Sequence, residues 1–251
     1  MTTLIAGGDS FTWGSELPDS DGSRYSRLSW SALLAKRKGM NYKCVAKAGS
    51  GNESMMRRVV DAVSKDRDCF VAVMWTYPIR LDIHLNQMTF EIMAKEFPAV
   101  VPDGWMTLSS WDSIPYEEKI ERFAIADEGF RQHIRRQSQI KDQIKASMLT
   151  ESFFELSSGD HLRHNTVSSI LSLQAYLEKL QIPYLFSAVS DQVYQCLDDS
   201  FDPLTEAIDR SKWVGNGQGM LEWGKERNYP LTPMLHLPAE AHRAWIDAFI
   251  Q

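Results

Sequence analysis

Four short apolar segments constrain the fold of this chain more than any other feature. They occupy residues 3–8, 42–49, 69–76 and 183–189, and each is a continuous apolar run rather than an alternating one. Runs of this kind are typical of strands that are covered on both faces, as in a parallel sheet. We therefore expect a mostly parallel sheet at the centre of the protein.

The segments that separate and follow these runs predict helices. Four of them repeat apolar residues at the spacing of one buried helix face: residues 27–39, 52–66, 164–181 and 238–250. Gly39 suits the end of the first helix, and Asn52 suits the cap of the second. Strands and helices in this alternation predict a doubly wound α/β protein.

One long interruption stands apart from this alternation. Residues 84–160 contain a stretch rich in proline and tryptophan, followed by a long polar segment with helical character. We expect one large helical insertion here, acting as a cap over a site or as a surface for a partner. Residues 198–233 are rich in Gly, Asn, Asp and Pro, which favours loops with short helices. The chain 1–251 is thus predicted to be a single domain with this insertion.

Charge and composition exclude several classes of protein. A formal net charge of −6 gives no basic footprint for nucleic acid. No stretch has the roughly 20 apolar residues of a membrane span, and the N-terminus lacks the regions of a signal peptide. Three cysteines without CxxC spacing indicate free thiols in a reducing compartment. We therefore expect a cytoplasmic protein that binds neither nucleic acid nor membrane, or a virion protein if the chain is phage-encoded.

Polar residues gather where the predicted strands end. Ser10 follows the first strand in "GGDSFTWG", and Gly49 lies in the glycine-rich turn after the second. Thr76 and Arg80 follow the third strand, and His236 lies in a turn before the last helix. Because functional sites of doubly wound sheets lie at the carboxyl ends of the strands, we expect these residues to form a site around Ser10.

These motifs, in this order, resemble the SGNH (GDSL-type) hydrolase superfamily. The family has Gly-Asp-Ser just after its first strand, as in "GGDSFTWG", and a glycine at the turn after its second, as in "AKAGSGN". Its last block is a histidine before the C-terminal helix, as in "HLPAEAHRAW". The resemblance runs from residue 4 to the C-terminus without the insertion. It is nearest to a divergent branch that we associate with phage and environmental bacterial sequences.

The resemblance implies a three-layer α/β/α, flavodoxin-like fold. It also implies a hydrolase with an acyl-serine intermediate and without metal or cofactor. Ser10 would be the nucleophile, and His236 would be the base that takes its proton. The backbone amides of Ser10 and Gly49 would stabilise the oxyanion. Asp9 would shape the turn, and Asp9 and Arg80 are candidates for lining the substrate pocket.

Two positions depart from the family's pattern. Its third block ends in an asparagine that donates to the oxyanion, and Thr76 stands there in this chain, so the Thr76 hydroxyl or the Asn52 amide would complete the hole. Its aspartate, three residues before the histidine, is replaced by Pro233. Three interpretations stay open. The chain has a Ser–His dyad, another carboxylate such as Glu222 or Asp191 orients the histidine, or the protein is not a working hydrolase.

The expected activity is therefore hydrolysis of an ester, with acyl groups on carbohydrates, such as acetyl esters, as the first class to test. The alternative is a catalytically weak or inactive binding or structural protein of the same fold, such as a component of a phage virion. Both departures favour this alternative. A thioesterase or lipid esterase would instead show an apolar acyl tunnel under the insertion. Apart from the ester substrate, we expect partners at the insertion only: a second copy or a virion protein.

Overall fold

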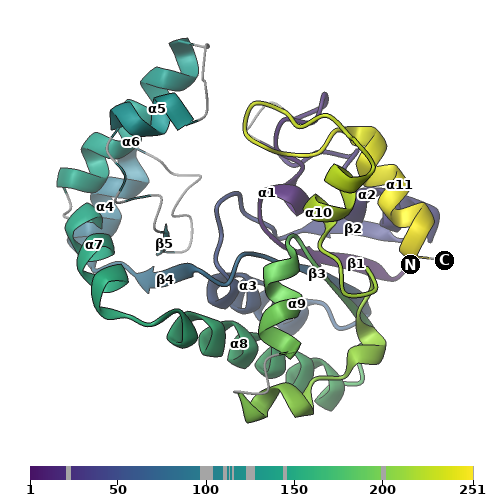
Figure 1. Cartoon of the computed structure of the whole chain (residues 1–251). Helices are drawn as coiled ribbons and strands as arrows, with labels where there is room; N and C mark the ends of the chain where they lie inside the picture. Colours follow the sequence, from purple (N-terminus) through teal and green to yellow (C-terminus); the bar gives the residue numbers. More distant parts are fainter. Residues whose placement is uncertain are drawn as a thin grey trace. The chain divides into compact units, whose positions relative to one another are not determined.

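A computed structural model of the chain describes residues 1–20, 24–96, 104–109, 112, 114, 116–122, 128–143, 146–198 and 202–250 (Figure 1). It divides into two compact units. The first comprises Met1–Pro78 and Arg163–Gln251, and the second comprises Ile79–Leu162. The second unit includes the whole of the insertion predicted at residues 84–160.

The first unit is built on a four-stranded parallel sheet. Its strands are β1 (Thr3–Gly7), β2 (Asn41–Cys44), β3 (Cys69–Trp75) and β6 (Tyr184–Ala188), in the order β2-β1-β3-β6. Each of the four predicted strands is found, and every pair in the sheet is parallel. The predicted α/β class and the mostly parallel sheet are thus confirmed.

Both faces of this sheet are buried, which explains the continuous apolar runs. Ile5 packs into a cluster on one face, whereas its neighbours Leu4 and Ala6 pack into a second cluster on the other. One face is covered by α3 (Asn52–Lys65), α8 (Gly159–Lys179) and α9 (Asp191–Asp198), and the other by α2 (Trp30–Arg37), α10 (Met220–Glu226) and α11 (Ala239–Phe249). Strand residues therefore meet helix side chains on either side, so neither face selects for polar residues.

The four predicted helices correspond to α2, α3, α8 and α11, with ends that differ by a few residues. The region 198–233 contains α10 and two short 3₁₀ helices, Pro203–Ala207 and Arg210–Lys212, as its composition suggested. Helix α9 was not predicted. Its buried face is formed by Val193, Tyr194, Cys196 and Leu197.

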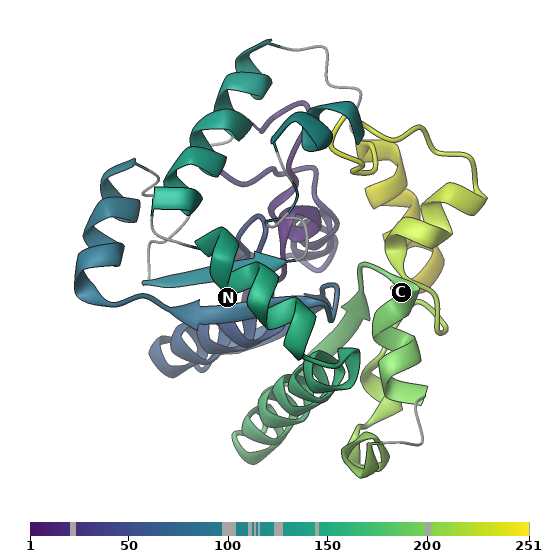
Figure 2. The same cartoon turned by 60° about the vertical axis from the view of Figure 1, so that its left-hand side comes forward.

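The second unit has a small sheet of its own. Strands β4 (Arg80–His84) and β5 (Trp105–Ser109) pair in antiparallel fashion and lie side by side in Figure 2. Leu85, Met93, Met106 and Leu108 form its buried core. The helices of this unit are α4 (Gln87–Glu96), α5 (Tyr116–Arg122), α6 (Glu128–Gln143) and α7 (Ala146–Leu156). The described residues of the predicted insertion 84–160 thus form helices, as expected, and also strand β5, which pairs with β4 at the start of the insertion. The sequence predicted neither strand.

None of the helices in the described parts of the chain combines the length and apolar character that a bilayer crossing requires.

Candidate functional site

The carboxyl ends of β1 and β3 lie next to each other because these strands pair directly. From β1 the chain proceeds to β2 at one edge, whereas β6 pairs with β3 on the opposite side. The order of strands therefore reverses between β1 and β3, and ligands of doubly wound sheets bind at such a reversal. Ser10 lies at this point, where it is the first residue of the short helix α1 (Ser10–Trp13).

Asp9 holds the turn that presents Ser10. Its side chain is completely buried, and its Oδ1 accepts the Phe11 N–H at 2.9 Å, which caps α1. Its Oδ2 accepts the hydroxyl of Thr76, just past β3, at 2.6 Å. The turn-shaping interpretation of Asp9 agrees with these contacts. Complete burial argues against the predicted role in lining a substrate pocket.

Asn52 ties the beginning of α3 to the end of β3. Its Oδ1 accepts the backbone N–H of Thr76 at 2.9 Å, and its Nδ2 donates to the Thr76 carbonyl at 3.0 Å and to Thr166 Oγ1 at 3.1 Å. The Thr76 hydroxyl hydrogen and both Asn52 amide hydrogens thus have acceptors inside the protein. To donate to an oxyanion, as predicted, either side chain would have to give up one of these bonds.

The predicted oxyanion donors of the backbone, unlike the side chains of Thr76 and Asn52, are not engaged by described acceptors. Within the described part of the chain, the N–H groups of Ser10 and Gly49 have no hydrogen-bond acceptor. Gly49 adopts a left-handed conformation, with φ of 74°, in the exposed turn before α3. The other glycine of this turn, Gly51, is buried and has φ of −87° as the cap of α3. The requirement for glycine thus falls on Gly49.

Two contacts fix the turn that carries Gly49. The Lys47 N–H donates to the carbonyl of Gly8 at 3.1 Å, which joins this turn to the segment before Ser10. From α3, Nε of Arg58 donates to the carbonyl of Val45 at 2.9 Å. The second block of the predicted site is therefore attached to the first through backbone hydrogen bonds.

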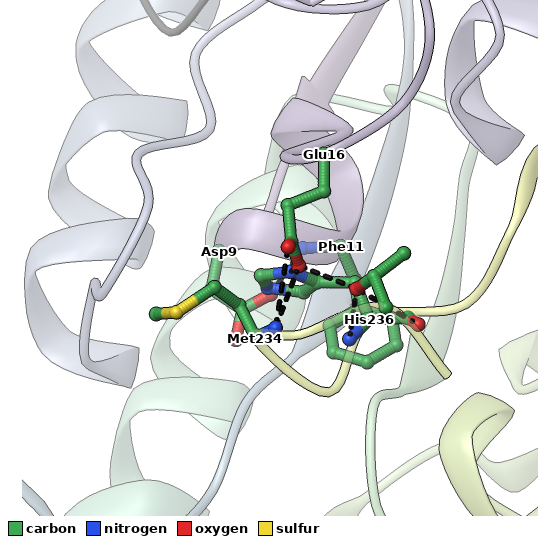
Figure 3. A network of polar contacts seen from close by, with 6 residues as sticks. Asp9, Phe11, Glu16, Met234 and His236 are labelled. Atoms are coloured by element: carbon green, nitrogen blue, oxygen red, sulfur yellow. Dashed lines mark hydrogen bonds and ion pairs between the residues drawn. The ribbon is translucent and has the colours of Figure 1, made fainter. Parts of the chain in front are cut away.

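His236 comes to this site from the far end of the chain. Its ring meets the ring of Phe11, the residue after Ser10, edge to face with centroids 5.3 Å apart (Figure 3). Its Nδ1 lies 2.6 Å from Oε2 of Glu16. The side chains are 12% and 23% exposed, respectively, so solvent reaches both only in part. The imidazole predicted as the base therefore lies against the helix that Ser10 begins.

Glu16 is the carboxylate that accompanies His236, and the sequence did not indicate it. Burial raises the pKa of Glu16, but hydrogen bonds from His236 and Thr232, the charge of His236 and the Met234 N–H lower it, and the net shift is downward from 4.5. The two carboxylates considered from the sequence lie elsewhere. Glu222 accepts from the Ser190 hydroxyl and from the backbone N–H of Asp191, both at 3.2 Å, and Oδ1 of Asp191 accepts from Gly219. Both carboxylates organise the region of α9 and α10.

The other residues considered for the site differ in their surroundings. His242, six residues after His236, is buried in α11, and its Nδ1 accepts the backbone N–H of Trp30 at 3.1 Å, so it has a packing role. Arg80 is the first residue of β4 and belongs to the second unit, so its contact with a substrate remains a prediction. Among the described residues, the hydroxyl of Ser10 has no hydrogen-bond partner, and no cluster of three His, Cys, Asp or Glu side chains could hold a metal ion.

Comparison with models of known protein families found no match, and no curated protein matches the chain by sequence.

The glycine before Asp9 gives a direct test of how tightly this turn is built. A Cβ on Gly8 would lie 2.0 Å from Thr12 Oγ1 and 2.4 Å from Thr12 Cβ, and that hydroxyl accepts from Nε1 of Trp30 at 3.1 Å. A rotamer change of Thr12 cannot move its Cβ, so Gly8→Ala must displace backbone. We expect a loss of about 1–3 kcal/mol or more in the free energy of unfolding, measured by urea denaturation.

Gly159→Ala is the matched control for this substitution, because a Cβ there meets nothing within 4 Å. We expect it to change stability by less than about 0.5 kcal/mol. If Gly8→Ala were equally neutral, the turn before Ser10 would be looser than the structure indicates.

Proposed function

We propose that this protein is a serine hydrolase of the SGNH type that cleaves an ester through an acyl-serine intermediate. One observation carries the proposal: the His236 imidazole packs on Phe11, at the start of the helix that Ser10 begins. The imidazole that we propose as the base, from the far end of the chain, thus lies against the residue that follows the proposed nucleophile. The backbone N–H groups of Ser10 and Gly49, for which no described residue supplies an acceptor, support the proposal.

The chemistry follows from these groups. The Ser10 hydroxyl attacks the ester carbonyl while its proton passes to Nε2 of His236, and a bond forms between Oγ and the carbonyl carbon. The N–H groups of Ser10 and Gly49 stabilise the oxyanion; one such donor is worth about 3 kcal/mol of barrier. The imidazolium then gives its proton to the departing alcohol. Water, deprotonated by the same imidazole, then attacks the acyl-enzyme. The bond between Oγ and the acyl carbon breaks, the imidazolium returns its proton to Ser10 Oγ, and the acid is released.

Acyl esters of carbohydrates, such as acetylated oligosaccharides, are the substrate class that we propose. The support is an analogy of fold and motif order, so the class is tested directly with O-acetylated oligosaccharides beside 4-nitrophenyl acetate. Release of acetate from the sugar with a larger kcat/KM than from the simple ester would favour it.

A binding or structural protein with this fold is the second candidate. The observation in its favour is that Thr76 and Asn52 already use their side-chain donors on neighbours, so neither side chain donates to an oxyanion without losing a bond. Such a protein would keep the turn geometry without turnover. A chemical probe for an activated serine separates the two candidates.

Labelling with a fluorophosphonate probe is expected to modify wild type at Ser10 and to fail with Ser10→Ala and His236→Ala. The reason is that the probe captures only a serine whose hydroxyl is deprotonated by a neighbouring base. Labelling is measured by in-gel fluorescence and by mass spectrometry of the labelled peptide. Ser15→Ala and His164→Ala are the matched controls and should label like wild type.

An unlabelled wild type that is folded by circular dichroism would reject the hydrolase and leave the binding protein as the better account. Labelling at a serine other than Ser10 would reject the assignment of the nucleophile.

A further inference from the structure

The carboxylate of Glu16 receives all of its described hydrogen bonds from one short segment, residues 232–236. The Thr232 hydroxyl donates to Oε2, the Met234 N–H donates to the carboxylate at 3.2 Å, and Nδ1 of His236 lies 2.6 Å from Oε2 (Figure 3). The bonds from Thr232 and Met234 connect Glu16 to the loop, and the bond from Nδ1 connects it to the imidazole ring of His236. Glu16 is therefore placed to fix both the position of the loop and the orientation of the imidazole.

The protonation state of this pair decides which imidazole nitrogen can act as a base. An ionised carboxylate only accepts hydrogen bonds, so a contact at 2.6 Å requires the proton on Nδ1 of His236. The neutral imidazole then carries its lone pair on Nε2. The downward shift of the pKa of Glu16 keeps the carboxylate in the accepting form at neutral pH.

The loop on the histidine side is closed by its own hydrogen bonds. The Thr232 N–H donates to the His236 carbonyl at 2.9 Å, and the His236 N–H donates to Thr232 Oγ1 at 3.0 Å. Thr232 therefore connects the backbone of the histidine with the carboxylate of Glu16. With the Phe11 ring against one edge, rotation of the imidazole is restricted from two sides.

Strained backbone occurs on both sides of the contact. Glu16 has φ of 61° and Leu235, beside the histidine, has φ of 63°. Residues with a Cβ rarely adopt this left-handed conformation, and it persists only where surrounding contacts enforce it. Such outliers concentrate at functional sites, and here two of them flank one carboxylate–imidazole pair.

We propose that Glu16 is the positioning acid of a Ser10–His236–Glu16 triad. This inference rests on the proposed hydrolase function and deepens it, because it answers how the histidine is oriented. The acid comes from the segment just after the nucleophile, whereas Pro233 stands three residues before the histidine. Under this proposal, Glu16 orients His236, and neither a Ser–His dyad nor the carboxylates of Glu222 and Asp191 are needed to explain the site.

Kinetics of three variants test this role. Glu16→Gln keeps the shape but removes the charge that selects the Nδ1–H tautomer, so kcat for 4-nitrophenyl acetate should fall about 10³- to 10⁴-fold with KM within about 3-fold. Glu16→Asp retains a carboxylate and should recover at least 10-fold over Glu16→Gln, as estimated roughly from the same tautomer argument. Glu222→Gln is the matched control and should stay within about 3-fold of wild type.

The tautomer itself is measured on the wild-type protein, independently of any variant. ¹⁵N-labelled histidine should show the neutral form of His236 as the Nδ1–H tautomer, with a low-field proton that disappears in His236→Ala. The Nε2–H tautomer in wild type would overturn the proposal even if Glu16→Gln failed to fold.

The outcomes of these experiments distinguish the proposed role of Glu16 from the proposed hydrolase function. If Ser10→Ala is inactive but folded Glu16→Gln keeps kcat within about 3-fold of wild type, Glu16 is not the acid and the hydrolase stands. If Ser10→Ala retains full activity, both the function and the triad are wrong. If Glu222→Gln loses activity and Glu16→Gln does not, the acid is Glu222.

Discussion

Ser10→Ala, His236→Ala and the double variant are expected to hydrolyse 4-nitrophenyl acetate equally slowly, with kcat about 10⁴- to 10⁶-fold below wild type. The reason is that a serine hydroxyl is a poor nucleophile without its base, and the base has no function without the hydroxyl. Loss of either therefore removes the whole acyl-serine route. Residual activity in all three should come from the backbone N–H groups of Ser10 and Gly49, which none of the variants changes.

The double variant is the informative member of this series. If Ser10 and His236 acted independently, the two losses in kcat would multiply, whereas residues that act as a unit are strongly non-additive. Stopped-flow and steady-state kinetics, with the urea midpoint of each variant as a check on folding, measure this. Multiplying losses would contradict a shared proton transfer between the two side chains.

Much of the first unit could be predicted because its signals are local. The strands of the parallel sheet are apolar on both faces, so they appear as continuous runs in the sequence. By contrast, β5 alternates: Met106 and Leu108 are buried, and the residues between and around them are only partly so. A strand that alternates in this way has no continuous apolar run, so β5 lacks the signal that marks the strands of the parallel sheet.

The sequence suggests which residues are candidates for the site, but it does not show which of their side chains contact one another. Ser10, Gly49 and His236 stand at ends of strands and helices, where position alone suggests a role. Glu16 and His236 are 220 residues apart in the chain, and no spacing rule joins them. The carboxylates that the sequence suggested, Glu222 and Asp191, lie elsewhere, whereas the carboxylate in contact with His236 belongs to Glu16, shortly after Ser10.

Thr76 and Asn52 show the limit of transfer from a family pattern. Their positions suggested oxyanion donors, because a hydrogen-bonding side chain follows the third strand in that pattern. The sequence does not show which acceptor a hydroxyl or amide selects. Here the Thr76 hydroxyl donates to Asp9, and the Asn52 amide bonds to the backbone of Thr76. Both side chains therefore stabilise the turn that holds Ser10.

The stability of the protein is expected to fall steeply below pH 6.5 because of His242. Burial, helped by the charge of His236 and opposed by a hydrogen bond with the Leu237 backbone, lowers the pKa of His242 from 6.5 to about 3. Between pH 6.5 and about pH 3, the His242 side chain is protonated in the unfolded chain but neutral in the folded protein. Stability therefore rises with pH in this window and is lost as pH falls, by about 1.4 kcal/mol per pH unit.

His242→Asn isolates this contribution. Its Oδ1 can replace Nδ1 as the acceptor of the Trp30 N–H, which is 3.1 Å from the imidazole, but it does not titrate. Urea denaturation at pH 6 and pH 4.5 should show a loss of about 2 kcal/mol more in wild type than in the variant. Other groups that titrate in acid, such as Glu16, are common to both proteins and cancel in the difference. Equal losses in the two proteins would mean that His242 takes up its proton without unfolding, which is incompatible with an imidazole buried as an acceptor beneath α2.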